Sequence, residues 1–292
     1  MKLVVETDIG NDADDYFSLC YLISAGVDLK AILVYPGYRD QIAITKLLLR
    51  EVELDIPVGS ASVDIDKPSL SGPHVRIMDH YGAEKSEKPD GPGHEIMNTV
   101  MSEHPDCELF VCGPMKNFRK FYHRNATFPK RATMQGGFVP YSVTDAMGID
   151  VVRLDKFEGR DLMPTTNLNG DMQGSIMFLD APIERRFVGK NVCHTLNYNK
   201  DIHDYVRLFE ANSRASEMLR EGMDVYLAKK QGKLFHDPVA AICHLHPDVA
   251  TWITGKPYRE GGKWGTHVFP DGDLLAVAID ENRMWDILAQ GL

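Results

Sequence analysis

Four aspartates crowd a short segment near the start of the chain, which reads Glu-Thr-Asp-Ile-Gly-Asn-Asp-Ala-Asp-Asp from Glu6 to Asp15. Without a cation, repulsion between these carboxylates would raise some of their pKa values and destabilise the loop. Calcium and other hard cations bind several carboxylate and carbonyl oxygens at once. Gly10 permits a tight turn that would let the carboxylates converge. The segment therefore predicts a divalent-cation site, with calcium favoured, that draws on Asp8, Asp12, Asp14 and Asp15.

Helix capping is the alternative explanation for these acids. An aspartate at a helix N-terminus satisfies free backbone N–H groups and interacts favourably with the helix dipole. Capping accounts for one or two of the four aspartates, but not for all of them. An EF-hand is excluded because the acids do not alternate over a 12-residue loop and no glutamate closes it.

The surrounding sequence alternates short apolar runs with amphipathic segments. We expect a strand over Lys2–Glu6, a helix over Tyr16–Ala25, a strand over Leu29–Tyr35 and a helix over Gln41–Val52, followed by strands over 56–58, 108–112 and 132–135. This alternation predicts an α/β fold with an open, mostly parallel central sheet flanked by helices. Ligands of such sheets bind beyond the carboxyl ends of the strands, where the acidic loop lies.

The last third of the chain predicts a helical C-terminal part, with helices over 213–229 and 238–245. It also predicts a closing hairpin over Phe269–Ile279, turned at Pro270-Asp271-Gly272. The stretches 60–93 and 138–169 are expected to be irregular, and loops of that length are commonly functional. We expect one domain over residues 1–292.

Composition limits the partners. With 292 residues, a hydrophobic fraction of 43% and a net charge of -10, the chain predicts a globular protein without a broad nucleic-acid-binding face. A small neutral or cationic ligand fits this charge more easily. No apolar run reaches the length of a membrane span, and the first residues do not resemble a signal peptide. The five cysteines are expected to be reduced and buried, which favours a cytoplasmic location.

Three motifs are similar to those of the inosine-uridine-preferring nucleoside hydrolase family. Thr7 to Asp15 matches the loop variant Thr-Asp-Ile-Gly-x-Asp-x-Asp-Asp, with Glu6 standing for an aspartate and Tyr16 for a small residue. His236-Asp237-Pro238 resembles the late His-Asp-Pro motif of the family. Gly113 to Asn117 resembles the Gly-Pro-Leu-Thr-Asn turn, with Lys116 in place of the threonine.

This resemblance implies a nucleoside-hydrolase-like fold and calcium-dependent hydrolysis of the N-glycosidic bond of a ribonucleoside. One calcium ion would be held by Asp8, Asp15, Asp237 and the backbone carbonyl of Lys116. Asp14 would act as general base, and His236 would protonate or orient the leaving base. The bound ion would lower the pKa of water, and carboxylates would stabilise an oxocarbenium-like state. The resemblance also implies a homodimer or homotetramer.

The resemblance places the substrate contacts less firmly. Asp161 to Asn169 resembles a family segment that binds the ribose hydroxyls. This chain has Asp161 where the family has an asparagine, and Asn167 where the family has a glutamate. A hydroxyl can donate to a carboxylate and accept from an amide, so the exchanged pair could still hold one. Residues 138–160 look like an insertion before this segment. The predicted substrate-binding residues are Asp12, His80, Asn117, Asp161, Asn167 and Asn169, although His80 could equally be a solvated loop histidine.

Two further functions remain open on the sequence alone. One is an N-ribohydrolase of the same scaffold that acts on a nucleotide or a modified nucleoside, with a phosphate bound by lysines and arginines. The side chains considered for that role are Lys116, Arg153, Lys156 and Arg160. The other is a metal-dependent ribosyl-binding protein without turnover. A small-molecule nucleoside or a related ribosyl compound is the expected partner, with no nucleic acid and no membrane.

Overall fold

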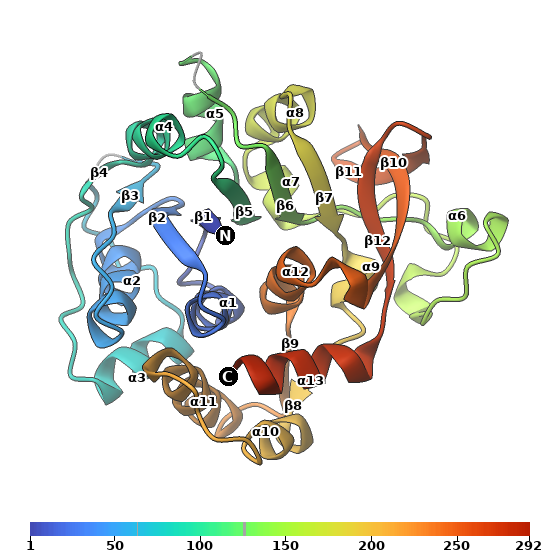
Figure 1. The fold of residues 1–292 in the computed structure, drawn as a ribbon. Helices are drawn as coiled ribbons and strands as arrows, with labels where there is room; N and C mark the ends of the chain where they lie inside the picture. Colours follow the sequence, from blue (N-terminus) through green and yellow to red (C-terminus); the bar gives the residue numbers. More distant parts are fainter. Residues whose placement is uncertain (63, 125–126) are drawn as a thin grey trace.

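A single ten-stranded sheet organises the computed structural model, which describes residues 1–62, 64–124 and 127–292 (Figure 1). Strands β12 through β4 pair in parallel, and β10 is antiparallel to both of its neighbours. The predicted α/β class with an open, mostly parallel sheet is confirmed. In spatial order the strands are β11 (Lys263–Val268), β10 (Ala250–Glu260), β12 (Asp273–Ile279), β7 (Glu184–Val188), β6 (Arg131–Gln135), β5 (Glu108–Cys112), β1 (Lys2–Thr7), β2 (Asp28–Val34), β3 (Val58–Ser60) and β4 (Gly91–Pro92).

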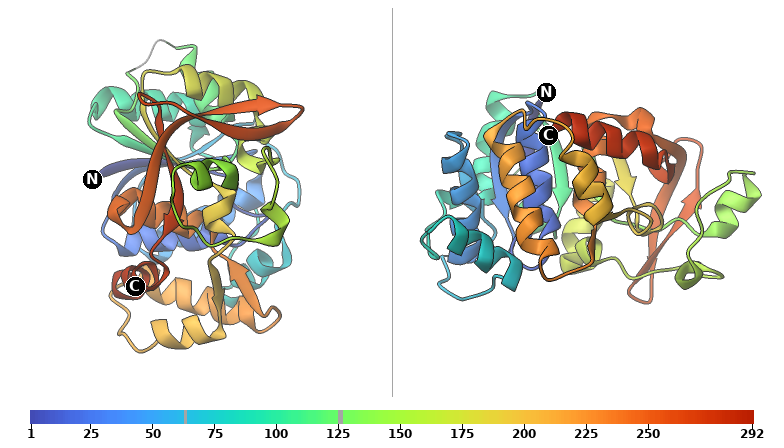
Figure 2. Two further views of the ribbon diagram at one scale, coloured as in Figure 1. Left: turned by 90° about the vertical axis from the view of Figure 1, so that its right-hand side faces the viewer. Right: turned by 90° about the horizontal axis from the view of Figure 1, so that it is seen from below.

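Helices cover both faces of this sheet (Figures 1 and 2). One face carries α1 (Asp14–Ser24), α2 (Arg39–Glu51), α12 (His236–Leu245) and α13 (Glu281–Gly291), with α3 (Gly72–His80), α10 (Lys200–Val206) and α11 (Arg214–Leu227) packed outside them. The other face carries α4 (Gly93–Glu103), α5 (Lys116–Tyr122) and α8 (Met172–Asp180). Shorter elements are α6 (Tyr141–Ala146), η1 (Asp155–Phe157), α7 (Thr166–Gly170), α9 (Lys190–Cys193), η2 (Pro247–Val249) and the small sheet of β8 (Asn197–Asn199) and β9 (Gly232–Leu234).

The apolar run of β1 explains why both faces are covered. Successive side chains of a strand point to opposite faces, so Leu3 and Val5 enter the core under α1 and α12, whereas Val4 enters the core under α4 and α5. All three side chains are fully buried. A strand that is apolar on both faces needs helices on both sides, which is the arrangement of parallel sheets.

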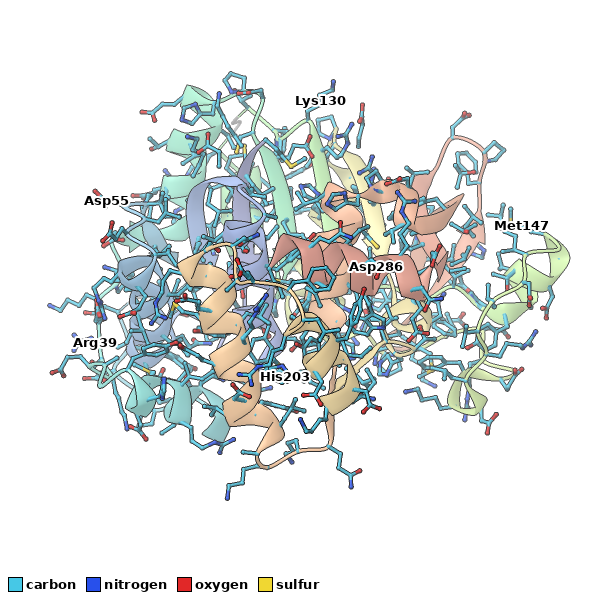
Figure 3. The ribbon with its side chains drawn as sticks, turned by 60° about the horizontal axis from the view of Figure 1, so that its bottom comes forward. Arg39, Asp55, Lys130, Met147, His203 and Asp286 are labelled. Carbon is cyan, nitrogen blue, oxygen red and sulfur yellow. The ribbon has the colours of Figure 1, made fainter. Side chains whose placement is uncertain are left out.

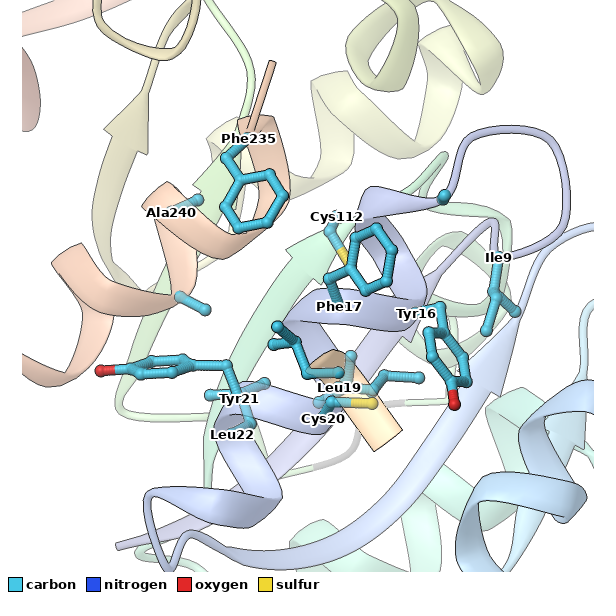
Figure 4. Close-up of a cluster of buried hydrophobic side chains, with 14 of the residues drawn as sticks. Ile9, Tyr16, Phe17, Leu19, Cys20, Tyr21, Leu22, Cys112, Phe235 and Ala240 are labelled. Atoms are coloured by element: carbon cyan, nitrogen blue, oxygen red, sulfur yellow. The ribbon is translucent and has the colours of Figure 1, made fainter. Parts of the chain in front are cut away.

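Aromatic packing fixes α1 against α12 (Figure 4). The rings of Phe17 on α1 and Phe235, the residue before α12, have centroids 5.8 Å apart. Both side chains are fully buried, and burying a phenylalanine stabilises a fold by about 1.5–3 kcal/mol. This contact sets the distance between the two segments of the chain that carry the acidic loop and the His236-Asp237 motif.

The C-terminal hairpin is a correction to the sequence analysis. The turn at residues 270–272 is present, but β11 and β12 do not pair with each other. Both pair with the long strand β10, on its opposite edges, and the actual hairpin joins β10 to β11 through Gly261 and Gly262. The turn residues therefore predicted where the chain reverses direction, but not which strand β12 pairs with, because strand pairing depends on residues far away in the sequence.

Other boundaries also differ from the prediction. The third strand lies at Val58–Ser60 rather than 56–58, and the stretch 60–93 contains α3 and β4. The segment 138–160 forms α6 and η1 and projects from one edge of the molecule, with Met147 near its outer end (Figures 2 and 3). All five cysteines are buried and free of disulfides, as expected. No helix in the described ranges is long and apolar enough to span a bilayer.

A buried histidine links α12 to the sheet and gives the fold a pH dependence. His244 Nδ1 lies 2.8 Å from Thr133 Oγ1 on β6, and burial, with the nearby arginines, lowers the pKa of His244 to about 3. Below pH 6.5 the unfolded chain binds a proton here that the folded chain does not, so the contribution of His244 to stability falls as pH falls. Lowering the pH from 7 to 5 should therefore change the stability of the protein by about 2 kcal/mol less favourably than that of His244→Gln, which keeps the other titrating groups. Urea unfolding of both proteins at both pH values measures this difference, and an equal change in the two proteins would contradict it.

Candidate metal centre and substrate cavity

A cavity of about 230 Å³ opens at the carboxyl ends of β1, β5 and β6. The chain fills the sheet outward from β1 through β2 and β3, and then from β5 through β6 and β7 in the opposite direction. Open α/β sheets bind ligands at such a reversal. The cavity is lined by Asp8, Asn11, Asp12, Asp14, Asp15, Cys112, Gln135, Gly136, Thr165, Thr166, Asn167, Lys190, His194, His236 and Asp237.

Two glycines shape the acidic loop. Gly10 has a φ of +126°, a conformation that L side chains rarely adopt. Gly113, directly after β5, approaches the loop so closely that a Cβ would lie 2.6 Å from the backbone nitrogen of Asp8. Thr7 then donates a hydrogen bond of 2.5 Å from its hydroxyl to Asp15 Oδ1. The loop is therefore held in one conformation from both sides.

The structure gathers carboxylates from two distant segments. Asp14, Asp15 and Asp237 are buried, and one oxygen from each lies within 4.8 Å of the others, while Asp8 lines the same cavity. Burial and neighbouring carboxylates raise the pKa of Asp8 to about 7 and hold the pKa values of Asp15 and Asp237 well above their ordinary range. An all-oxygen cluster under such repulsion fits a hard divalent cation, so these residues could hold a metal ion.

Capping does not account for the cluster. The N-cap residue of α1 is Ala13, which has no side-chain cap. Asp14 and Asp15 occupy the first turn, where the helix dipole favours an acid by about 0.3–1 kcal/mol. That gain is smaller than the cost of several kcal/mol for burying an uncompensated charge. The convergence of the acids therefore needs a further explanation, which a bound cation would supply.

Lys233 on β9 is a partner that the sequence analysis missed. Its Nζ lies 3.0 Å from Asp12 Oδ2 and 3.2 Å from Asp14 Oδ2, and its side chain is only 5% exposed. Burial alone would raise the pKa of Asp14, but hydrogen bonding to His236 and the charge of Lys233 outweigh burial and lower it to about 2. The sequence offered one sign of this role: Lys233 stands three residues before His236, separated from it by the apolar pair Leu234-Phe235.

His236 is oriented by Asp14. The backbone N–H of His236 donates to Asp14 Oδ2 over 3.2 Å, and its Nδ1 lies 3.4 Å from the same oxygen. Its Nε2 and Asp14 Oδ1 are buried and have no hydrogen-bond partner in the described structure. The ring of His194 lies 4.8 Å from that of His236, centroid to centroid. The cavity therefore contains an unsatisfied ring nitrogen and an unsatisfied carboxylate oxygen.

The predicted site residues divide into two groups. Those brought together in the cavity are Asp8, Asp12, Asp14, Asp15, Asn167, His236 and Asp237. Lys116, His80, Asn117, Asp161 and Asn169 are not among the residues that line it. The carbonyl of Lys116 as a metal ligand and the four other side chains as substrate contacts therefore stay predictions.

Each side chain outside the cavity has other surroundings. The side chain of His80 is 52% exposed, and its Nε2 lies 3.9 Å from the carboxylate of Glu221. The side chain of Asn117 is buried and packs against Gly93, where there is no room for a Cβ. The backbone N–H groups of Asn117 and Phe118 donate to the carboxylate of Glu6, the residue that stands in place of the first aspartate of the motif. The carboxyl of Glu6 is an acceptor for the start of α5, and burial raises its pKa to about 8.

The expected ribose-binding segment is held by the hairpin of β10 and β11. Met163 pairs with Trp264 on β11, and the indole of Trp264 donates to Asn169 Oδ1 over 2.9 Å. Asn169 in turn donates to the carbonyl of Gly262, and Asp161 is exposed to solvent. Only Asn167 of this segment's predicted contacts reaches the cavity, where its amide donates to the carbonyl and Oε1 of Gln135. The sequence analysis also missed Gln135, Thr165, Lys190 and His194.

Comparison with known proteins agrees with this architecture. No protein-family model matches the chain. An uncharacterised protein of Aquifex aeolicus is 26% identical over 268 residues, which cover 87% of each sequence. Among solved structures, a plant nucleoside hydrolase superimposes with a TM-score of 0.73 at 16% identity, over 99% of this chain and 98% of that one. The chain has the nucleoside hydrolase fold.

Two bacterial nucleoside hydrolases of known structure also share the fold. A purine-preferring ribonucleoside hydrolase of Gardnerella vaginalis gives a TM-score of 0.69 at 16% identity, over 100% of this chain and 98% of the other. An inosine-uridine-preferring nucleoside hydrolase of Bacillus anthracis also gives 0.69, at 14% identity over 99% and 98% of the two chains. The nucleoside hydrolase fold expected from the motifs is therefore confirmed.

The buried ion pair of Lys233 leads to a stability prediction. In metal-free protein, Lys233→Met should lower the free energy of unfolding by about 3–5 kcal/mol, because it leaves the buried carboxylate of Asp14 without its cation. Urea denaturation at pH 7 measures this loss. Lys200→Met is the control, since Lys200 and its partner Asp204 are both exposed, and it should leave the midpoint unchanged. Equal stability of the two variants would contradict the account.

Proposed function

We propose that this protein hydrolyses the N-glycosidic bond of a ribonucleoside, releasing the base and ribose, with the help of one calcium ion. One observation carries the proposal. The buried carboxylates of Asp14, Asp15 and Asp237 lie beside His236 in the cavity of a fold whose solved representatives include nucleoside hydrolases. A buried acidic cluster and an unsatisfied histidine in one cavity suit a hydrolytic reaction better than simple ligand storage.

The carboxylates have distinct proposed roles. Asp8, Asp15 and Asp237 hold the cation, and the Lys116 carbonyl is proposed as a further ligand on the basis of the motif alone. A divalent cation supplies Lewis-acid chemistry: it lowers the pKa of water and orients hydroxyl groups of the substrate. Asp14 is ionised at neutral pH and has a free Oδ1, so it is the proposed acceptor of the water proton. The ionised carboxylates also stabilise positive charge that develops on the ribosyl ring.

His236 is proposed to act on the leaving base. The Nδ1 atom of His236 lies beside Asp14 Oδ2. Its Nε2 has no partner in the described structure, so Nε2 is the atom available to donate a proton or a hydrogen bond to that base. Asn167 is proposed to contact the ribose, because its amide is already fixed by Gln135 and it lines the cavity. Asp12 remains a second candidate for substrate contact. We also propose that the protein is a homodimer or homotetramer, which rests on the motif resemblance alone, and that it is cytoplasmic, which rests on its reduced cysteines.

Replacing one proposed ligand should have opposite effects with and without calcium. Asp237→Asn removes a charge from the repelling cluster, so the metal-free variant should melt at a higher temperature than the unchanged protein. The same change should weaken calcium binding at least about tenfold and reduce ribose release from inosine and uridine. Thermal unfolding, calorimetry and a reducing-sugar assay measure the three effects.

The exposed residue Asp204 provides the control, since Asp204→Asn lies outside the cavity and should change none of these quantities. Unchanged calcium affinity in Asp237→Asn would contradict the metal centre. Calcium and ribose binding without cleavage of any ribonucleoside would instead favour a binding protein.

The leaving-group role of His236 has its own test. His236→Gln should lower kcat for inosine by about 10²–10⁴-fold, because departure of the base then lacks its proton donor. A riboside with a p-nitrophenolate leaving group needs no such proton, so its kcat should change far less. Steady-state kinetics on both substrates decide the matter. Equal losses on the two ribosides would assign His236 a structural role.

A further inference from the structure

Charge is distributed unevenly around the cavity. Among the described residues, the loop after β1, the first turn of α1 and the start of α12 contribute all of its carboxylates. The polar side chains that the structure describes in the remaining wall are uncharged or basic, namely Gln135, Thr165, Thr166, Asn167, Lys190 and His194. The acidic part is explained by a metal ion, but the basic part has no role in the proposed mechanism.

Lys190 is a cavity lysine without a counter-ion. It begins α9, is separated from the end of β7 by one residue, is partly buried, and has no carboxylate within 4.0 Å in the part of the chain that the structure describes. Burial and the charge of Lys156 lower the pKa of Lys190, and no carboxylate acts against them. Lys233 is the contrast, because Asp12 and Asp14 surround it. The carboxylates of the metal centre therefore compensate Lys233 but not Lys190.

A second lysine and an unsatisfied hydroxyl accompany Lys190. Lys156 Nζ donates to His194 Nδ1 over 2.8 Å, and His194 lines the cavity. Thr165 also belongs to the cavity lining, is 98% buried, and its Oγ1 has no hydrogen-bond partner in the described structure. Buried polar groups normally have partners. The cavity lining therefore contains a lysine without a counter-ion and a threonine with an unsatisfied hydroxyl.

We propose that the ribosyl substrate carries an anionic group, a phosphate or a carboxylate, and that Lys190 binds this group. The inference rests on the proposed hydrolysis of a ribosyl bond and names the substrate class of that site. A divalent cation held by Asp8, Asp15 and Asp237 would, together with Lys233, offset three of the five carboxylate charges in the cavity lining. Lys190 would then be a basic side chain available to attract the anion.

The acidic net charge of the chain, which favoured a neutral or cationic ligand, does not oppose this inference. Nearby charges in a cavity of low dielectric constant outweigh distant ones that water screens. Of the four basic residues considered for phosphate binding, Arg153 is paired with Glu158 and Asp145. Lys116 and Arg160 do not line the cavity, and Lys156 reaches it only through His194.

Matched neutral and anionic substrates test the proposal. The first pair is uridine and uridine 5′-monophosphate, which differ by a charged phosphate on the ribose. The second pair is uridine and orotidine, which differ by a charged carboxylate on the base. With calcium present, we expect kcat/KM to favour the anionic member of one pair by about tenfold to a hundredfold, the range of a hydrogen bond to a charged group. Lys190→Gln should abolish that preference, and Lys190→Arg should retain it. Lys200→Gln, at an exposed lysine outside the cavity, is the control.

Calorimetry gives a readout that does not depend on turnover. Ribose 5-phosphate should bind more tightly than ribose, or orotate more tightly than uracil, in the protein with Lys190 and not in Lys190→Gln. Cleavage and binding that favour neutral compounds in both pairs, or an anion preference that survives Lys190→Gln, would overturn the inference. Cleavage of no ribosyl compound would overturn the proposed hydrolysis instead, and the binding comparison would still decide the role of Lys190.

Discussion

Repulsion among buried carboxylates is the constraint on which the rest of the structure depends. Asp8, Asp15 and Asp237 come from two segments more than 200 positions apart in the chain, and the packing of Phe17 against Phe235 forces those segments together. Burying one uncompensated charge costs several kcal/mol, a large fraction of the stability of a typical domain. The buried carboxylates lie at the carboxyl ends of β1 and β5, in a cavity that a ligand can enter. A bound divalent cation would convert the same repulsion into affinity.

Lys233 divides the acidic cluster into two parts. Its charge and the hydrogen bond to His236 keep Asp14 ionised, whereas burial and neighbouring acids push the pKa values of Asp15 and Asp237 upward. Carboxylates whose environments separate their pKa values in this way commonly have separate roles in catalysis. Lys233 forms ion pairs with Asp12 and Asp14 only, since its side chain is fixed between them. The remaining acids are the ones whose charges a bound cation would compensate.

Local patterns in the sequence predicted the centre of the fold well. The acidic loop, the strand before it and the helix after it depend on neighbouring residues, and the alternation of strands and helices predicted the parallel sheet. Asp237 could be placed beside the loop only through motif resemblance. Lys190 and Lys233 carried no comparable local signal, because their roles come from contacts with residues far away in the chain.

The ribose-binding segment shows the limit most clearly. Its sequence matched a motif in part, but the pairing of Met163 with Trp264 and the hydrogen bond from Trp264 to Asn169 decide where its side chains lie. Glu6 is a similar case, since the sequence did not show that its carboxylate accepts hydrogen bonds from the start of α5. Spacing along the chain could not predict either contact, because each joins segments about 100 residues apart.

The central claim is that the acidic cluster holds a divalent cation. A crystal structure of the protein grown with manganese, a calcium substitute with an anomalous signal, tests it directly. The account predicts one strong anomalous peak at ligand distance from the carboxylates of Asp8, Asp15 and Asp237. A cavity without such a peak, in which these carboxyl groups share protons and hydrogen-bond to one another, would contradict it.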